Sequence, residues 1–234
     1  MNIVVIHAGM SEHASTVQLG TLIADELVTI ASEVSATPLS IEWIAMRPLA
    51  HQITDHILTG FPPADLAVAQ ESVAKADAIV ALSPTYQASY SGLFKSFFDV
   101  LPENSLENKP VLIGATGGTP RHAQVTESAL RPLFSYLHAD TVPTAIYAAT
   151  EDWGAHATDS AGDGGEALIR RVRRAARQLL MRANSHLLSN QGNILGVTSG
   201  FSAPLSATLD SGAESVSETW PGFTDFETLM GGSQ

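Results

Sequence analysis

Cysteine is absent from this chain of 234 residues, which excludes disulfide bonds, cysteine nucleophiles and thiolate metal sites. Basic residues are scarce as well: 12 Lys and Arg stand against 24 Asp and Glu, giving a net charge of −12. Nucleic acids and anionic membranes are bound through basic surfaces. We therefore expect no nucleic-acid partner and no membrane partner.

Long hydrophobic runs are also missing. The longest apolar stretches, such as 2–8 and 77–82, fall well short of the roughly 20 residues that a membrane-spanning helix needs. Met1 leads directly into the first of these stretches, and no basic segment typical of a signal peptide precedes it. Together with the lack of cysteine, these features favour a cytoplasmic enzyme or electron carrier.

The chain alternates between short runs rich in Val and Ile and longer amphipathic segments. The short runs are almost continuously apolar, as in strands covered on both faces, and they lie at 2–8, 39–46, 77–83, 110–115 and 142–148. The amphipathic segments predict helices at 16–32, 63–76, 91–101, 123–139 and 165–189, with a further short helix at 49–60. This alternation predicts an α/β fold: a doubly wound, five-stranded parallel sheet with helices on both faces.

Two regions break this alternation. Residues 151–165 are rich in Asp, Gly and Ala and predict a loop, in which Asp159 and Asp163 lack the ordered spacing of a calcium-binding EF-hand. From about residue 190 onward the chain is dominated by small and polar residues. We expect a folded domain at 1–190 and an extended C-terminal tail at 191–234.

The loop after the first predicted strand has neither the glycine motif of dinucleotide-binding folds nor a P-loop. It carries the hydroxyl groups of Ser11, Ser15 and Thr16 beside the free N–H groups of a helix start, a combination that suits a phosphate. Because no Lys or Arg precedes Arg47, neutral donors would hold that phosphate, as they can in FMN binding. An ordinary helix cap is the alternative.

The loop at 83–91 follows the third predicted strand. In an open α/β sheet, ligands bind beyond the carboxyl ends of the strands, where the strand order reverses. The first and second loops therefore converge on one crevice. Tyr86 or Tyr90 can flank a flat ring there, and the N–H groups of 87–89 can meet its edge, although either tyrosine is as readily explained by packing.

The loop at 115–122 follows the fourth predicted strand. Gly117 and Gly118 permit close approach of the backbone to a ligand. Arg121 is the nearest cation for the phosphates of a nicotinamide nucleotide or for the charge of a reduced flavin. The alternative is a plain glycine turn, with Arg121 paired to a neighbouring acid.

These motifs together resemble one family. The pattern Pro84-x-Tyr86, followed by Gly92-Leu-Phe-Lys95-x-x-x-Asp99, is similar to that of the NADPH-dependent FMN reductases of the flavodoxin-like superfamily. An actinobacterial branch of that family is indicated by the segments ATGGTPRH at 115–122, LRPLF at 130–134 and ATEDWG at 149–154. The likeness covers residues 1–190, but the first loop lacks the arginine of the commoner Gly-Ser-x-Arg form.

The resemblance implies a flavodoxin-like fold with FMN as cofactor and NADPH or NADH as reductant. Lys95 and Asp99, at helical i,i+4 spacing, are interpreted as a structural ion pair, and His7 as a packed side chain. Carried over by position, the residues implied to hold the FMN phosphate are Ser11, Ser15 and Thr16, and those implied to line the flavin ring are Pro84, Thr85, Tyr86, Gln87, Thr116, Gly117 and Gly118.

The implied activity is transfer of hydride from the nicotinamide to FMN, supplying reduced flavin to a separate flavin-dependent monooxygenase. This chemistry requires ring stacking rather than acid–base catalysis, so we assign no catalytic side chain and no metal ligand. The resemblance also implies a homodimer or homotetramer. The alternatives are a flavodoxin-type electron carrier, a quinone or azo reductase of the same fold, and an interaction module that binds no FMN.

Overall fold

The computed structural model describes residues 1–34, 38–153 and 164–194. Its central sheet has the order β2-β1-β3-β5-β6, and the strands of this path pair in parallel. This is the flavodoxin-like order, with the fifth position shared by two short strands. The strands are β1 (Asn2–His7), β2 (Ser40–Ala45), β3 (Ala78–Tyr86), β5 (Pro110–Gly117), β6 (Asp140–Thr141) and β7 (Ile146–Ala149), with β4 (Ser89–Tyr90) paired to β3 alone.

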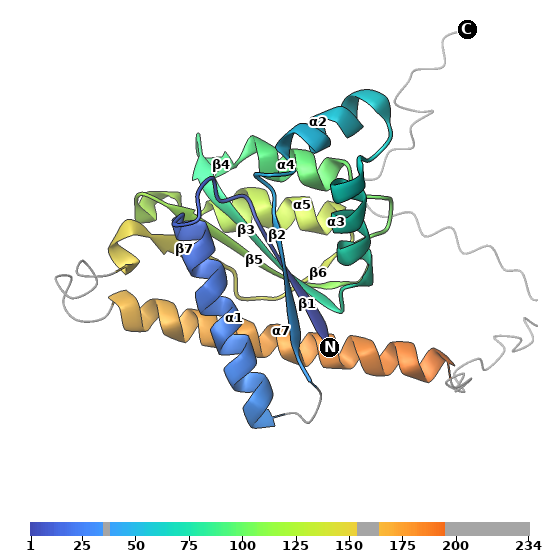
Figure 1. Cartoon of the computed structure of the whole chain (residues 1–234). Helices are drawn as coiled ribbons and strands as arrows, with labels where there is room; N and C mark the ends of the chain where they lie inside the picture. The colour runs from blue at the N-terminus through green and yellow to red at the C-terminus, as the bar shows by residue number, and fades with distance from the viewer. Residues whose placement is uncertain (35–37, 154–163, 195–234) are drawn as a thin grey trace, which may run out of the picture. The chain divides into compact units, whose positions relative to one another are not determined.

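Helices cover both faces of the sheet, as predicted (Figure 1). Alternate residues of a strand point to opposite faces, so Ile3 and Val5 join one core cluster while Val4 and Ile6 join the other. The first cluster is closed by α1 (Ser15–Val34) and α7 (Gly164–Ile194), and the second by α2 (Ala50–Thr59), α3 (Ala64–Lys75), α4 (Gly92–Asp99) and α5 (Arg131–Tyr136).

A group of phenylalanines holds α4 and α5 together on the second face. Phe98 lies between Phe94 and Phe134, with ring centroids 4.7 and 5.0 Å away, and Phe97 meets it edge-on at 5.5 Å. Tilted and edge-to-face rings at these distances add to the energy of apolar burial. The two helices that follow β3 and β5 are thereby fixed beneath the loops that precede them.

Three element boundaries differ from the sequence prediction. β3 continues to Tyr86 instead of ending near residue 83, and α7 continues to Ile194 instead of ending near residue 189. Of the helix predicted at 123–139, only residues 131–136 are regular α-helix, as α5; a π turn at Thr126–Leu130 precedes α5, and a 3-10 turn at Pro120–His122 lies before the predicted range. Pro132 has no N–H to give to the carbonyl four residues earlier, which disfavours a regular α-turn at that point.

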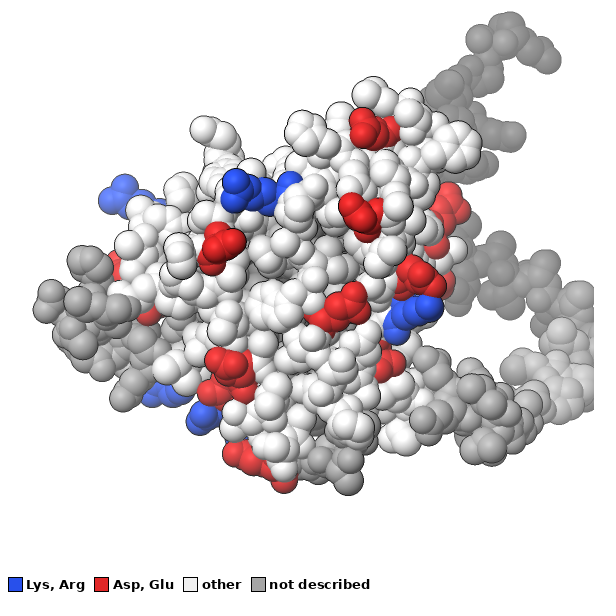
Figure 2. Space-filling model, in the orientation of Figure 1, with Lys and Arg blue, Asp and Glu red and all other residues white. Residues whose placement is uncertain are grey.

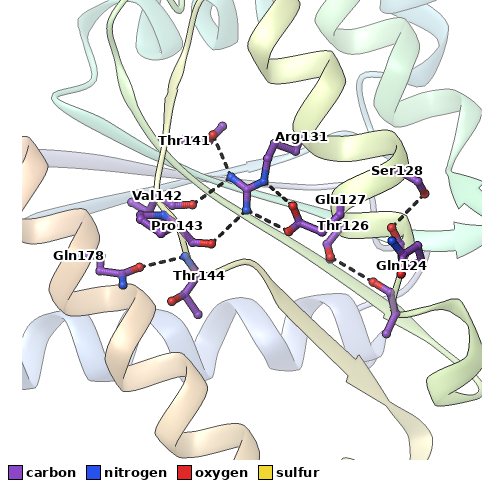
Figure 3. Close-up of polar contacts among 11 residues, drawn as sticks. Gln124, Thr126, Glu127, Ser128, Arg131, Thr141, Val142, Pro143, Thr144 and Gln178 are labelled. Carbon is purple, nitrogen blue, oxygen red and sulfur yellow. Dashed lines mark hydrogen bonds and ion pairs between the residues drawn. The ribbon is translucent and has the colours of Figure 1, made fainter.

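Of the strand predicted at 142–148, only the second half forms, as β7, whereas β6 lies just before the predicted range at residues 140–141. Side chains satisfy the backbone between the two strands (Figure 3). Arg131 donates to the carbonyl oxygens of Val142 and Pro143, at 3.1 Å each, and to the hydroxyl of Thr141 at 3.0 Å. The same guanidinium forms two hydrogen bonds with Glu127. Polar side chains thus replace the ladder bonds that a continuous strand would make.

Acidic side chains are spread over the face shown in Figure 2, with fewer basic side chains among them. Among the residues described, no helix is long and apolar enough to cross a membrane. Much of the loop predicted at 151–165, including Asp159 and Asp163, lies outside the described residues, as does the predicted tail from residue 195 onward.

Candidate functional site

The carboxyl ends of β1, β3 and β5 lie side by side at one edge of the sheet. His7 at the end of β1 is in register with Leu82 of β3, and Pro84 of β3 is in register with Thr116 of β5. From β1 the chain moves outward to β2 and then returns to β3 on the other side, so the strand order reverses between β1 and β3. Ligands of doubly wound sheets bind at this position.

The first loop turns from β1 into α1 over residues 8–14. Ser11 and Ser15 are exposed, whereas Thr16 is buried. In the described part of the chain, the N–H groups of Ser15 and Thr16 have no hydrogen-bond acceptor. Unpaired N–H groups at a helix start form a site for an anion, and the helix dipole adds to it.

Thr16 turns into the protein and meets Thr116 of the third loop. Their hydroxyl oxygens are 2.9 Å apart, and both side chains are buried. This hydrogen bond joins the start of α1 to the end of β5 across the sheet. The structure therefore brings two predicted site residues together. Their hydroxyl groups bond each other, however, instead of facing a ligand.

His7 supports the first loop from beneath. The N–H of Gly9 donates to Nδ1 of His7 at 3.3 Å, and the imidazole ring meets Trp43 of β2 edge-on with centroids 6.0 Å apart. Burial lowers the pKa of His7. The interpretation of His7 as a packed side chain is confirmed.

The second loop is a β-hairpin. β3 and β4 pair through Thr85 with Tyr90 and Tyr86 with Ser89, leaving a two-residue turn. That turn places Gln87 at φ 49° and Ala88 at φ 62°, both in the left-handed region that residues other than glycine seldom adopt. Two successive residues of this kind match the mirror-image turn of tight hairpins.

The two tyrosines of the hairpin differ in environment. Tyr90 is partly buried and packs on Phe94, with ring centroids 5.9 Å apart, whereas Tyr86 is 52% exposed at the tip. The hydroxyl of Ser83 accepts the N–H of Ser91 at 2.9 Å and so closes the base of the hairpin. Of the two aromatic candidates, Tyr86 is the one presented at the edge of the sheet.

The third loop begins where β5 ends at Gly117. A methyl group at Gly118 would meet no atom within 4 Å, while one at Gly117 would overlap the hydroxyl oxygen of Tyr147. Glycine is thus needed at these two positions for different reasons. Gly117 makes room for Tyr147, and Gly118 leaves the backbone open to a ligand. Arg121 is exposed and takes part in none of the ion pairs among the described residues.

Tyr147 on β7 was not identified from the sequence. Its buried hydroxyl donates to the carbonyl oxygen of Thr119 at 2.8 Å, and burial raises its pKa. Nearby, the hydroxyl of Thr85 is buried without a hydrogen-bond partner in the described part of the chain. Nothing in the sequence around this tyrosine indicates its contacts with the third loop.

Lys95 and Asp99 form an ion pair along the exposed side of α4. Both side chains are partly exposed, and the spacing is i,i+4. The interpretation of this pair as structural is confirmed, because its members bond each other along one helix.

Comparison with known proteins gives a family and several relatives. The model of the family described as NADPH-dependent FMN reductase matches residues 1–154. The NADH-dependent FMN reductase SfnE of Pseudomonas putida is 32% identical over 186 residues, which cover 80% of this chain and 94% of SfnE. SfnF of the same organism, also named an NADH-dependent FMN reductase, is 36% identical over 118 residues; the match spans 50% of this chain and 63% of SfnF.

Among solved structures, an oxidoreductase from Corynebacterium diphtheriae superimposes with a TM-score of 0.72. It is 34% identical, and the match covers 79% of this chain and 97% of that protein. The similarity therefore extends over both halves of the sheet and over all three loops.

Proposed function

Since the chain belongs to the NADPH-dependent FMN reductase family, we propose that it transfers hydride from NADPH or NADH to FMN at the crevice between β1, β3 and β5. The observation that carries this proposal is the convergence of three unlike loops at the point where the strand order reverses. The first loop offers unpaired N–H groups, the second loop an exposed aromatic side chain, and the third loop a glycine backbone that is open to a ligand.

The residues present fit FMN at both ends. The phosphate is assigned to the hydroxyls of Ser11 and Ser15 and to the free N–H groups of the α1 start. At the ring end, the side chain of Tyr86 is exposed and the backbone at Gly118 is open, so both can contact a flat ring.

The remaining predicted contacts are proposed with distinct roles. Pro84, Tyr86 and Gln87 line the ring from the hairpin, and Gly118 approaches it with open backbone. Thr16 and Thr116 hold the first and third loops together through their hydrogen bond. Gly117 is required by Tyr147 rather than by a ligand.

Hydride transfer from the nicotinamide to FMN requires no catalytic side chain. FMN, when bound, supplies the hydride acceptor. The protein binds the two nucleotides, aligns their rings and excludes water, and no acidic or basic side chain is assigned a proton-transfer role. Arg121, exposed beside the third loop, is proposed to bind the phosphates of the nicotinamide nucleotide.

Reduced FMN is proposed to serve a separate flavin-dependent monooxygenase. We also propose a homodimer or homotetramer, and a cytoplasmic location, where the reduced nicotinamide nucleotides that the reaction consumes are produced. These assignments are supported by membership of the family.

The test is oxidation of NADPH and of NADH under air, with FMN or riboflavin as acceptor. Turnover that saturates in both nucleotide and FMN supports the reductase. Tight FMN binding without turnover favours an electron carrier, and no FMN binding overturns the proposal. Quinones and azo dyes as acceptors test the remaining alternative activity.

The phosphate assignment is tested by the variant Ser15→Ala. It should raise the KM for FMN about threefold to tenfold, because one hydrogen bond to a charged group is lost, and leave the KM for riboflavin unchanged. Ser32→Ala, at the far end of the same helix, is the matched control. Equal losses with both flavins would show that Ser15 does not bind the phosphate.

A further inference from the structure

Tyr147 lies beneath the two loops assigned to the flavin ring. On β7 it is in register with Ala115 of β5, and its side chain is 8% exposed. The phenol reaches past the end of β5, where its hydroxyl donates to the Thr119 carbonyl oxygen at 2.8 Å. Because Thr119 precedes the 3-10 turn at Pro120–His122, this bond fixes the direction in which the third loop leaves the sheet.

The hydroxyl also determines which residue can stand at 117. The backbone of Gly117 lies outside the left-handed region, so its conformation does not require glycine. A methyl group there would overlap the Tyr147 hydroxyl oxygen and approach the ring carbon that bears it to 3.2 Å. Tyr147 and Gly117 are therefore two halves of one packing arrangement.

The same methyl position lies 3.5 Å from Cβ of Thr85. The end of the phenol thus stands close to the hairpin loop as well as to the third loop. Thr85 is the residue whose buried hydroxyl lacks a partner in the described part of the chain. The Tyr147 hydroxyl therefore bonds the backbone of the third loop and lies near the side chain of Thr85 in the hairpin.

β7 gives this side chain a firm base. Arg171 of α7 donates to the backbone carbonyl of Tyr147 at 3.4 Å and to Asp152 at 3.3 Å, and Asp152 accepts the N–H of Ala149 at 2.7 Å. These contacts hold the short strand against α7. Side chains that set the geometry of a binding site need such support from their own surroundings.

We propose that Tyr147 is a positioning residue of the flavin site, which holds the Thr119 carbonyl beneath the third loop and leaves the Gly118 backbone open to the flavin ring. This inference rests on the proposed function. Its physical basis is preorganisation: a loop already held in its binding conformation loses less entropy when the ligand binds.

The test is a double-mutant cycle of Tyr147→Phe and Gly117→Ala, with FMN affinity measured by fluorescence titration. Tyr147→Phe should raise the dissociation constant about fivefold, because one hydrogen bond is lost. Gly117→Ala should raise it about tenfold or more, because the methyl group forces the hydroxyl and the loop apart. In the double variant the overlap with the hydroxyl oxygen is gone and only the 3.2 Å approach to the ring carbon remains, so its constant should rise by clearly less than the product of the two single effects.

Steady-state kinetics separate positioning from general damage. Tyr147→Phe should raise the KM for FMN and leave kcat at saturating FMN close to that of the wild type. Tyr136→Phe, at a tyrosine of α5 that is 82% exposed, is the control and should change neither quantity. Thermal unfolding of each variant verifies that it is folded.

Additive effects in the cycle, with normal FMN binding by the wild-type protein, would overturn the role of Tyr147 and leave the proposed function intact. Failure of the wild-type protein to bind FMN would overturn the proposed function, and this inference with it. A fall in kcat at unchanged KM would contradict a positioning role.

Discussion

The hydrogen bond between Thr16 and Thr116 is the direct side-chain link between the first and third loops. Both hydroxyls are buried, so each depends on the other for its hydrogen bond. A buried polar group without a partner is destabilising, whereas removal of both partners of a pair is much less so. The pair therefore stabilises the arrangement of the site while leaving ligand contacts to its neighbours.

This asymmetry predicts the behaviour of three valine variants. Thr16→Val should lower the free energy of unfolding by about 1–2 kcal/mol, because it strands the hydroxyl of Thr116, and Thr116→Val should behave alike. The double variant should be less destabilised than the sum of the two. Urea unfolding gives all three values, and strict additivity would mean that the two hydroxyls do not depend on each other.

His7 makes the first loop sensitive to acid. Burial lowers its pKa in the folded protein below the unfolded value of 6.5, so the unfolded chain binds the proton more readily. The stability linked to neutral His7 is present above pH 6.5 and is lost as the pH falls below it. Protonation would also set an N–H at Nδ1 against the donor N–H of Gly9.

We therefore expect the variant His7→Gln to lose less stability than the wild type between pH 7.5 and 5. Gln accepts a hydrogen bond but does not titrate in this range. The free energy of unfolding, measured in urea at each pH, provides the comparison. Parallel curves for the two proteins would exclude His7 as the group responsible.

At the level of elements, the divided fifth strand depends on one arginine. Arg131 bonds the backbone between β6 and β7 and the carboxylate of Glu127 in the π turn that precedes α5 (Figure 3). Gln178 of α7 accepts the N–H of Thr144 in the same gap at 3.0 Å. The interruption is therefore tied to a helix on each face of the sheet.

Arg131→Met should destabilise the protein by about 1–3 kcal/mol, because it leaves two partly buried carbonyls without their donor, while the exposed carboxylate of Glu127 is solvated. The matched control is Arg174→Met on the exposed side of α7, which should change the free energy of unfolding by less than about 0.5 kcal/mol. Chemical denaturation measures both. Equally small effects of the two substitutions would show that water replaces the guanidinium without loss of stability.

The order of elements was predictable from the sequence, whereas two details of the strands were not. Continuous apolar runs and amphipathic segments are local patterns, and they located the five strand positions and the helices that cover them. The division at 142–145 depends on Arg131 and Gln178, which reach it from distant parts of the chain. The hairpin depends on a turn of Gln87 and Ala88, a pair that rarely forms one.

For the candidate site, too, some features follow from local sequence patterns and others depend on contacts between distant residues. Hydroxyls after the first strand and glycines after the fourth mark their loops because they are short-range signals, and the parallel sheet brings those loops together. The bond from Thr16 to Thr116 and the contact of Tyr147 with Gly117 join residues from different strands or helices. Such pairs carry no local pattern in a single sequence.

At the scale of the whole molecule, the site lies at the carboxyl ends of the strands and a buried charged side chain lies at their amino ends. Lys109, just before β5, is 6% exposed and donates to the carbonyl oxygens of Val73 and Ala74 at the end of α3, at 2.7 Å each. Burial lowers its pKa to about 8, against a partly compensating effect of Asp77. The unfolded chain, with a value of 10.5, holds the proton to higher pH.

Between pH 8 and 10.5 the unfolded chain therefore binds more protons at this position, and the contribution of Lys109 to stability rises with pH. Relative to the variant Lys109→Met, the wild-type protein should gain stability from pH 7.5 to pH 10. Urea unfolding at both pH values measures that gain. An unchanged difference between the two proteins would place the titration of Lys109 outside this window.

The hairpin that forms the second loop also limits how its length can change. Side chains alternate between the two sides of a strand, so one added residue would turn every later side chain of that strand to the opposite side. Two residues, one added before Gln87 and one after Ala88, would lengthen the ribbon by one rung and move the turn outward. An engineered hairpin that keeps both the pairing of Thr85 with Tyr90 and the two-residue turn must therefore gain or lose residues in pairs, one from each strand.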